Sequence, residues 1–222
     1  SKLYVFNDGG RVANKEDKES RKQIKKIIED VDWDCELFTN YSKKNLGCGK
    51  AVTSAISWAF TEEDRLIILE DDCVPSINFF SYCNYCLEEY KNDQRVMQIA
   101  GNNYTENNNY TNDDYLFSKY GHIWGWATWK RAWNHFDYSM REWPIFRNNN
   151  YLQNCSNSVD EYNYLLNIFN YYYNDPLKPW AIRWLFAKIK MGGLSIVPRI
   201  NLIKNIGDIG TNKYIHPNSP AF

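Results

Sequence analysis

The chain has 222 residues, 44% of them hydrophobic, and a formal net charge of −1 at pH 7. This length is enough for one substantial core, and the near-neutral charge is not that of a polyanion-binding protein, so nucleic acid is not expected as a partner. No stretch approaches the roughly 18 apolar residues of a membrane span, and the first residues lack the basic and apolar regions of a signal peptide. We therefore expect a cytoplasmic protein with at most peripheral membrane contact.

Strand and helix patterns alternate through the first hundred residues. Apolar runs predict strands at 2–6, 34–40, 65–70 and 95–101, and helical spacing or glycine starts predict helices at 16–31, 45–60 and 77–93. The run RLIILE is apolar from Leu66 to Leu69, as expected for a central parallel strand covered on both faces. The alternation predicts an α/β fold with a mostly parallel, doubly wound central sheet.

The pattern changes after Gly101. The sequence predicts a polar loop over 102–115, a tryptophan-rich segment over 121–133 that leads into a helix, and an irregular polar stretch over 137–160. Helices are then expected at 159–175 and 179–193 and a last pair of strands within 194–207. We expect a single domain, 1–222, with a nucleotide-binding half (1–101) and an acceptor-binding half (102–222). The chain starts directly on the strand KLYVF, so a βα unit that normally precedes such a strand is expected to be missing.

The six cysteines are scattered through a mid-sized chain rather than packed into a small scaffold, which favours reduced thiols. Cys83 and Cys86 form a lone CxxC without a second pair or a spaced pair of histidines, so a zinc site is not expected. On a helix this spacing places two small apolar side chains on one face.

Three consecutive carboxylates, Glu70, Asp71 and Asp72, follow the apolar run directly. One interpretation is a solvated acidic turn before Pro75. The other is a site for a divalent cation, because adjacent carboxylates raise one another's pKa unless a cation or hydrogen-bond donors relieve them. Ligands bind beyond the carboxyl ends of parallel strands, and Asn7-Asp8-Gly9-Gly10 ends a second predicted strand, which favours the cation site.

Five segments together resemble a bacterial branch of nucleotide-diphospho-sugar transferases with the GT-A fold, related to the N-acetylglucosaminyltransferase I type. They are LYVFNDGGR, VDWDCELFTNYSKKNLGCGKAVTSAISWAF, IILEDDCVPSINFF, YGHIWGWATWKRAW and GLSIVPRINLIKNIG. The resemblance implies a hexosyl- or N-acetylhexosaminyltransferase that uses Mn²⁺ or Mg²⁺, a nucleotide-diphospho-sugar donor and a glycan or glycolipid acceptor. It makes Glu70-Asp71-Asp72 the DXD-type motif, with Asp72 as the metal ligand and Glu70 and Asp71 facing the ribose and metal-bound water. It also implies a hydrogen bond from the nucleotide base to Asp8, with Gly9 among the residues that bind the nucleotide-sugar.

The resemblance also contains a departure. The family has an Asp, similar to a general base, where this chain has Ala181 in PWAIRWLFA. A methyl group cannot accept a proton, so the candidate bases are Glu142, Asp160 and Glu161. The last loop, NIGDIGTNKY, differs from the family pattern after Gly207.

Other polar and aromatic residues are weaker candidates. Arg11 and Lys50 are candidates for contacts with phosphate, Lys50 because it follows two glycines at an expected helix start, and both also fit a solvated charge. Gly125, Trp126 and Trp180 are candidates for the acceptor side. The spacing of Trp124, Trp126, Trp129 and Trp133 puts at least two of these rings in the core, and His122 suits either a core position or a ligand contact.

Three functions remain. The leading one is a glycosyltransferase of polysaccharide or glycoprotein assembly. The second is a nucleotide-sugar- or glycan-binding module without turnover, favoured by Ala181. The third is a metal phosphohydrolase, which is weak because no second cluster of His and Asp accompanies the acidic block.

Overall fold

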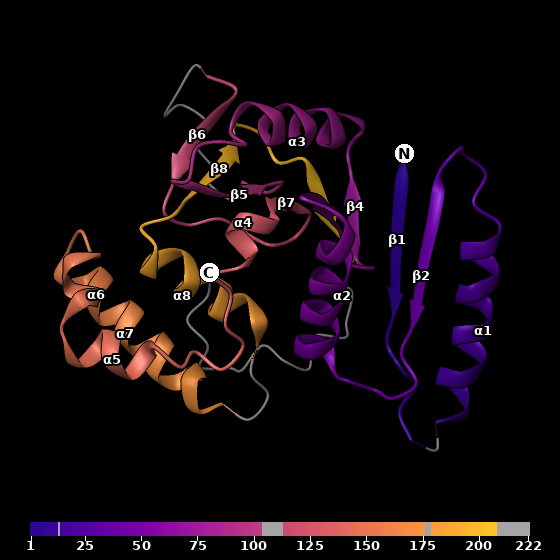
Figure 1. Ribbon diagram of the computed structural model, residues 1–222, viewed down its shortest axis with the longest axis horizontal. Helices are drawn as coiled ribbons and strands as arrows, with labels where there is room; N and C mark the ends of the chain where they lie inside the picture. Colours follow the sequence, from indigo (N-terminus) through magenta and orange to yellow (C-terminus); the bar gives the residue numbers. More distant parts are fainter. Residues whose placement is uncertain (13, 104–112, 176–178, 208–222) are drawn as a thin grey trace. The chain divides into compact units, whose positions relative to one another are not determined.

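The computed structural model describes all residues except 13, 104–112, 176–178 and 208–222. It is a mixed α/β structure (Figure 1), with strands β1 (Lys2–Asn7), β2 (Glu36–Tyr41), β3 (Arg65–Ile68), β4 (Cys73–Pro75), β5 (Val96–Ala100), β6 (Tyr115–Ser118), β7 (Trp126–Trp129), β8 (Leu194–Pro198) and β9 (Ile203–Asn205). The helices are α1 (Lys15–Glu29), α2 (Cys48–Glu62), α3 (Ile77–Glu89), α4 (Lys130–Trp133), α5 (Trp143–Asn148), α6 (Tyr151–Asn154), α7 (Val159–Asn174) and α8 (Trp180–Lys190).

The chain divides into two compact units, and each unit is built from two separate stretches. The first unit comprises Ser1–Glu63 and Asp137–Trp184, and the second comprises Asp64–Phe136 and Leu185–Phe222. The prediction of one domain with halves that meet at residue 101 stays a prediction.

In the first unit, β1 and β2 form a parallel pair with Lys2 opposite Glu36 and Asn7 opposite Tyr41. The ring of Tyr4 stacks on Phe38 at a centroid distance of 4.6 Å and meets Trp58 of α2 edge-on at 5.4 Å. Offset and edge-on contacts of this kind are the favourable arrangements of aromatic rings. They hold α2 against the strand pair.

Local signals explain where the helices of the first unit begin. The side chain of Asn14 accepts hydrogen bonds from the backbone N–H groups of Glu16 and Asp17 at the start of α1, which is the usual function of an N-cap asparagine. Before α2, Gly47 adopts a φ of +76°, a conformation that glycine reaches without steric cost. Helix α1 begins directly after Asn14, and α2 begins directly after Gly47. Both starts therefore lie next to a residue that marks them in the sequence.

The second unit contains a five-stranded mixed sheet with the order β3-β7-β5-β8-β6. Only β5 and β8 pair in parallel, while the pairs β3–β7, β5–β7 and β6–β8 are antiparallel. The predicted mostly parallel central sheet is therefore not what the structure shows. Two strands are responsible: β7 lies between β3 and β5 and runs antiparallel to both, and β6 runs antiparallel to β8.

The position of β3 also differs from the prediction. Its residues are exposed or half-buried, and among the described residues it pairs with β7 alone. The run RLIILE is thus an edge strand and not a central one. The fully buried strands are β5 and β7.

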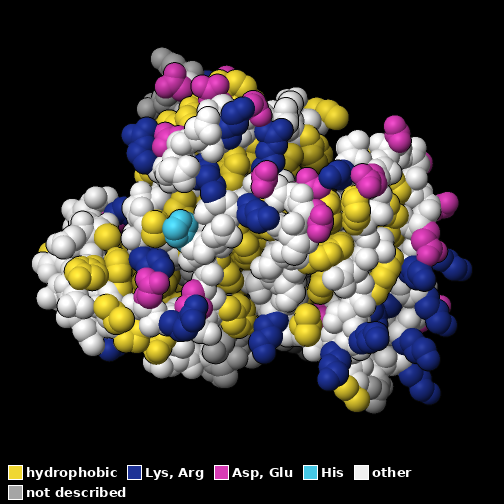
Figure 2. All heavy atoms as spheres, viewed as in Figure 1, with side chains coloured by type: hydrophobic (Ala, Val, Ile, Leu, Met, Phe, Trp, Pro, Cys, Tyr) yellow, Lys and Arg dark blue, Asp and Glu magenta, His cyan; other side chains and the backbone are white. Residues whose placement is uncertain are grey.

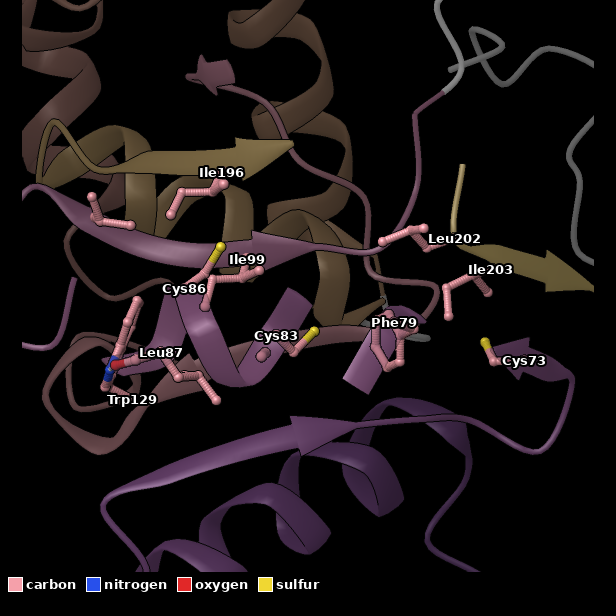
Figure 3. Close-up of a cluster of buried hydrophobic side chains, with 12 residues drawn as sticks. Cys73, Phe79, Cys83, Cys86, Leu87, Ile99, Trp129, Ile196, Leu202 and Ile203 are labelled. Atoms are coloured by element: carbon pink, nitrogen blue, oxygen red, sulfur yellow. Dashed lines mark hydrogen bonds between the residues drawn. The ribbon is translucent and has the colours of Figure 1, made fainter. Parts of the chain in front are cut away.

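A core of buried side chains in the second unit packs α3 against the sheet (Figure 3). Cys83 and Cys86 lie on the same face of α3 and are both 0% exposed, as their spacing predicts, with Cys86 beside Ile99 of β5. All six cysteines are free thiols. Two of them therefore serve as small apolar core groups.

The stretch 137–160 was predicted to be irregular, but it contains α5 and α6. These helices have 6 and 4 residues, too few for an apolar period to appear in the sequence. Trp143 of α5 is buried and meets Phe169 of α7 edge-on at 5.2 Å. The predicted loop over 102–115 and the last loop beyond Gly207 lie largely outside the described residues.

Candidate functional site

The three consecutive carboxylates form the turn between β3 and β4. The backbone N–H of Cys73 donates to the carbonyl oxygen of Glu70 at 3.0 Å, so Asp71 and Asp72 occupy the two central positions of a four-residue turn. Asp71 is exposed, whereas Glu70 and Asp72 are half-buried. The structure therefore confirms that the acidic block follows a strand and makes a turn there.

No residue in the described part of the chain neutralises the charge of this acidic turn. None of the three side chains makes an ion pair with any residue in the described part of the chain. Burial, together with the charges of Asp72 and Asp71, raises the pKa of the Glu70 carboxyl to about 7. A cation that approaches Glu70 would stabilise the charged form of its carboxyl.

Strand β9 and its end fix the backbone around Asp72. The N–H of Ile206 donates to the carbonyl oxygen of Asp72 at 2.8 Å, and a Cβ on Gly207 would lie 2.6 Å from Oδ2 of Asp72. A side chain at position 207 would therefore displace the carboxylate of Asp72. Oδ1 of Asp72 is the acceptor for the thiol of Cys73 at 3.4 Å.

These carboxylates fit a hard divalent cation in chemistry but do not enclose one. Carboxylate oxygens are the ligands that Mg²⁺ and Mn²⁺ prefer, and Mg²⁺ is commonly held by one or two carboxylates together with water and substrate phosphates. Over the residues that the structure describes, no three His, Cys, Asp or Glu side chains come together as a metal site. A cation on Asp72 would take its remaining ligands from water and from a ligand's phosphates.

Asp8 follows β1 directly in the first unit, and its side chain binds the backbone of the loop before α2. Its carboxylate accepts the backbone N–H groups of Leu46 at 2.9 Å and of Gly47 at 3.1 Å. A Cβ on Gly9 would lie 2.2 Å from the backbone carbon of Lys44, so this position requires glycine. Asp8, whose carboxylate also accepts the N–H of Gly9 at 2.8 Å, therefore has a structural role that the sequence did not indicate, and its side chain is half-buried.

The two predicted phosphate contacts differ in their surroundings. Arg11 forms a two-pronged ion pair with Asp17, with Nε–Oδ2 at 2.9 Å and Nη2–Oδ1 at 2.7 Å. This pair lowers the pKa of the Asp17 carboxyl to about 2. Lys50 is exposed in the first turn of α2. The charge of Arg11 is thus committed to Asp17, whereas that of Lys50 faces solvent.

The candidate bases differ in their local surroundings. Glu142 and Asp160 are exposed, and Glu161 accepts a hydrogen bond from the N–H of Asn157 at 2.5 Å at the start of α7. Ser158 completes this cap, because its hydroxyl accepts the N–H of Glu161 at 3.1 Å. Glu161 therefore has a capping function that the spacing S-x-x-E would have predicted. Ala181 is half-buried in the first turn of α8.

The predicted acceptor-side rings lie in the interior. Trp126 is 0% exposed and Trp180 is 3% exposed, so neither ring presents a face to a ligand here. Gly125 adopts a φ of +60°, and a Cβ there would lie 2.4 Å from Cδ1 of Ile203. This glycine allows β7 to approach β9 closely. These three positions are explained by packing.

A buried polar cluster in the second unit escaped sequence reasoning. Lys188 is 1% exposed, and its Nζ donates to Oγ of Ser195 at 2.5 Å. Burial lowers the pKa of Lys188 to about 7. His122 has its pKa lowered by burial and by Lys188, and its carbonyl oxygen accepts Nε2 of Gln98 at 2.6 Å. Lys188 lies among apolar residues of α8, and nothing in that run of the sequence indicated that it is buried beside Ser195.

Comparisons with known proteins add no identification. A scan against models of protein families finds no match to this chain, and a search among curated proteins finds none either. Across the part of the chain that the structure describes, no helix has the length and apolar character needed to cross a bilayer.

Proposed function

We propose that this chain is a metal-dependent glycosyltransferase. It transfers a hexosyl or N-acetylhexosaminyl group from a nucleotide-diphosphate donor, a UDP-sugar foremost, to a hydroxyl of a glycan or glycolipid in polysaccharide assembly. The observation that carries the proposal is the acidic turn, whose carboxylates have no counter-cation among the described residues while the pKa of Glu70 is raised to about 7. The resemblance of five sequence segments to GT-A nucleotide-sugar transferases supports the same function.

In this proposal, the acidic turn binds the cation and Asp8 contacts the nucleotide base. Asp72 would hold Mn²⁺ or Mg²⁺, with Glu70 and Asp71 oriented toward the ribose and toward metal-bound water. The bound cation supplies Lewis-acid stabilisation for the departing diphosphate. The half-exposed carboxylate of Asp8 at the end of β1 would accept a hydrogen bond from the nucleotide base, while its bonds to Leu46 and Gly47 keep it in place.

Calorimetric titration with UDP, in the presence and absence of Mn²⁺, tests the donor site. We expect Mn²⁺ to strengthen UDP binding by about tenfold or more, because each charge-assisted contact to phosphate contributes on the order of 1.5–3 kcal/mol. Asp72→Asn is expected to abolish this gain.

The matched control is Glu89→Gln, which removes an exposed carboxylate from α3 in the same unit. It should leave the gain unchanged. If Mn²⁺ has no effect on UDP affinity in the unaltered protein, the acidic turn is only a solvated turn.

A second candidate is a nucleotide-sugar- or glycan-binding module without turnover. Ala181 favours it, because this position carries no proton acceptor, and Glu161 is engaged in capping α7. The two candidates predict the same Mn²⁺-dependent UDP binding. Release of free sugar from UDP-sugars by the purified protein would favour the transferase, and tight binding without release would favour the module.

A further inference from the structure

A basic groove lies in the first unit between the start of α1 and the end of β2. Its cavity of about 780 Å³ is lined by ten residues, of which seven are cations and none is acidic: Gly10, Arg11, Asn14, Lys15, Lys18, Arg21, Lys22, Lys25, Tyr41 and Lys43. This volume lies within the range that small-ligand sites occupy. Figure 2 shows Lys and Arg side chains gathered on the part of the surface where Figure 1 draws α1.

Arg21 is a fixed cation at this groove. Its Nε donates to Oδ1 of Asn7 at 2.9 Å, and its Nη2 donates to the carbonyl oxygen of Ser42 at 2.9 Å. The guanidinium of Arg21 is half-buried. Both of its acceptors are neutral, so these hydrogen bonds orient its charge without a compensating carboxylate. Such a preorganised fork is well suited to bind a carboxylate or phosphate.

The lysines of the groove are only weakly neutralised by the protein. Lys22 and Lys25 form ion pairs with Glu19 at 3.3 Å and Glu29 at 3.6 Å, but all four side chains are more than half exposed, where such pairs are weak. Within the described residues, Lys15, Lys18 and Lys43 make no ion pair. Most of the positive charge of the groove is therefore available to a ligand.

The length of the groove selects an extended anion. Lys15 and Lys25 are ten residues apart on one helix, which corresponds to about 15 Å along its axis. The two adjacent phosphates of a single nucleotide diphosphate cannot reach both ends. A chain with anionic groups at intervals can.

The groove also has an apolar element that a bare polyphosphate would not use. The ring of Tyr41 lines it, with Nζ of Lys25 at 5.9 Å from the ring centroid. An aromatic face beside cations suits a ligand that alternates apolar ring faces with oxyanions. A concave groove also fits a chain better than the flat surface of a bilayer.

We propose that this groove binds a short stretch of an anionic glycan, a chain of sugar rings that carry carboxylates or phosphates. The proposal rests on the proposed glycosyltransferase function only for the identification of the anion as a glycan. It implies that the acceptor of the reaction is an acidic polysaccharide.

Binding of hexagalacturonate, measured by calorimetry without metal or nucleotide at low and at physiological salt, tests this proposal. We expect binding that weakens as salt rises, because exposed charges are screened. Three comparison probes are maltohexaose, a heptanucleotide of single-stranded DNA with the same number of charges, and vesicles of phosphatidylglycerol and phosphatidylcholine. Maltohexaose should not bind, and the nucleic acid and the vesicles should bind more weakly than hexagalacturonate.

The charge reversal Lys18→Glu is expected to weaken hexagalacturonate binding by about tenfold, and Arg21→Gln should weaken it as well. The matched control is Lys26→Glu, which makes the same change at an exposed position of α1 that does not line the groove. Lys18 is exposed and makes no ion pair, so its variant should unfold at the temperature of the unaltered protein.

An absence of binding would overturn the proposal, as would equal losses in Lys18→Glu and Lys26→Glu. Binding of the DNA or of the vesicles as tight as that of hexagalacturonate would also overturn it. A failure here leaves Mn²⁺-dependent UDP binding untouched, because the two experiments share no ligand.

Discussion

At the scale of single residues, Lys188 couples stability to pH. Its pKa is about 7 in the folded protein because of burial, whereas an exposed lysine has a pKa near 10.5. Between these two values the unfolded chain binds the proton and the folded protein does not, so the free energy of unfolding rises with pH across this window. The slope for one group is at most about 1.4 kcal/mol per pH unit.

Denaturant unfolding of the unaltered protein and of Lys188→Met at pH 7, 8 and 9 isolates this effect. We expect the unaltered protein to gain about 1 kcal/mol per pH unit relative to the variant. Thiols and phenols that titrate in this range are common to both proteins and cancel in the difference, and the lowered pKa of His122 places its titration below the window. Parallel pH profiles would show that Lys188 stays charged when buried.

Gly9 is a second residue with a measurable consequence. A Cβ there would lie 2.2 Å from the backbone carbon of Lys44 and 2.5 Å from the backbone nitrogen of Asn45. Because backbone atoms cannot yield as a flexible side chain does, Gly9→Ala should destabilise the protein by about 1–3 kcal/mol. The neighbouring Gly10→Ala is the control, since its Cβ would lie no closer than 3.3 Å to any neighbour. Equal melting temperatures of the two variants would contradict the close approach of these loops.

At the scale of elements, the cap of α7 separates a structural from a catalytic role of Glu161. Ser158→Ala removes the hydroxyl that accepts the N–H of Glu161 and should cost about 1 kcal/mol of stability. Glu161→Gln keeps an acceptor oxygen for Asn157 but cannot act as a base, so we expect it to retain both stability and any transfer activity.

Ser81→Ala serves as the control for the cap, because the hydroxyl of Ser81 donates to a helix carbonyl within α3 and caps nothing. Thermal unfolding and donor turnover are the two measurements. Loss of turnover in Glu161→Gln at unchanged stability would make Glu161 a base after all.

The elements also show how far the sequence determines the fold. Helices α1, α3, α7 and α8 were predictable because each is long enough for its periodicity or its ends to appear. Strand β7 was not, because Trp126, Trp129 and Trp133 recur at helical intervals, and β7 is buried on both faces and shows no alternation. This one strand reverses the pairing of the sheet around it.

For the candidate site, the sequence located the acidic turn but not its surroundings. The turn is local, so Glu70, Asp71 and Asp72 could be identified from three adjacent letters and the apolar run before them. The close approach of Gly207 to Asp72 joins residues far apart in the chain, and no local pattern encodes it. The basic groove was not predicted: Lys15, Lys18, Lys22 and Lys25 are interspersed with acidic residues in the sequence, and only the structure shows that no carboxylate lines the groove.

At the scale of the whole molecule, the net charge of −1 conceals an uneven distribution. Seven cations line one cavity of the first unit, while one turn of the second has three carboxylates that form no ion pair with a described residue. A net charge near zero therefore does not describe each local surface, because a groove can have a potential that differs from that of the whole molecule.

The interleaving of the two units has a consequence for synthesis on the ribosome. The first unit contains Ser1–Glu63 but is completed only by Asp137–Trp184, and the second is completed only by residues after Leu185. During synthesis, the segment Ser1–Glu63 must therefore wait for Asp137–Trp184 to emerge before its unit can be completed. Contacts between such distant segments form slowly, and incomplete chains expose aggregation-prone surface in the meantime. Expression in cells with abundant chaperones, or at low temperature, should accordingly favour a soluble product.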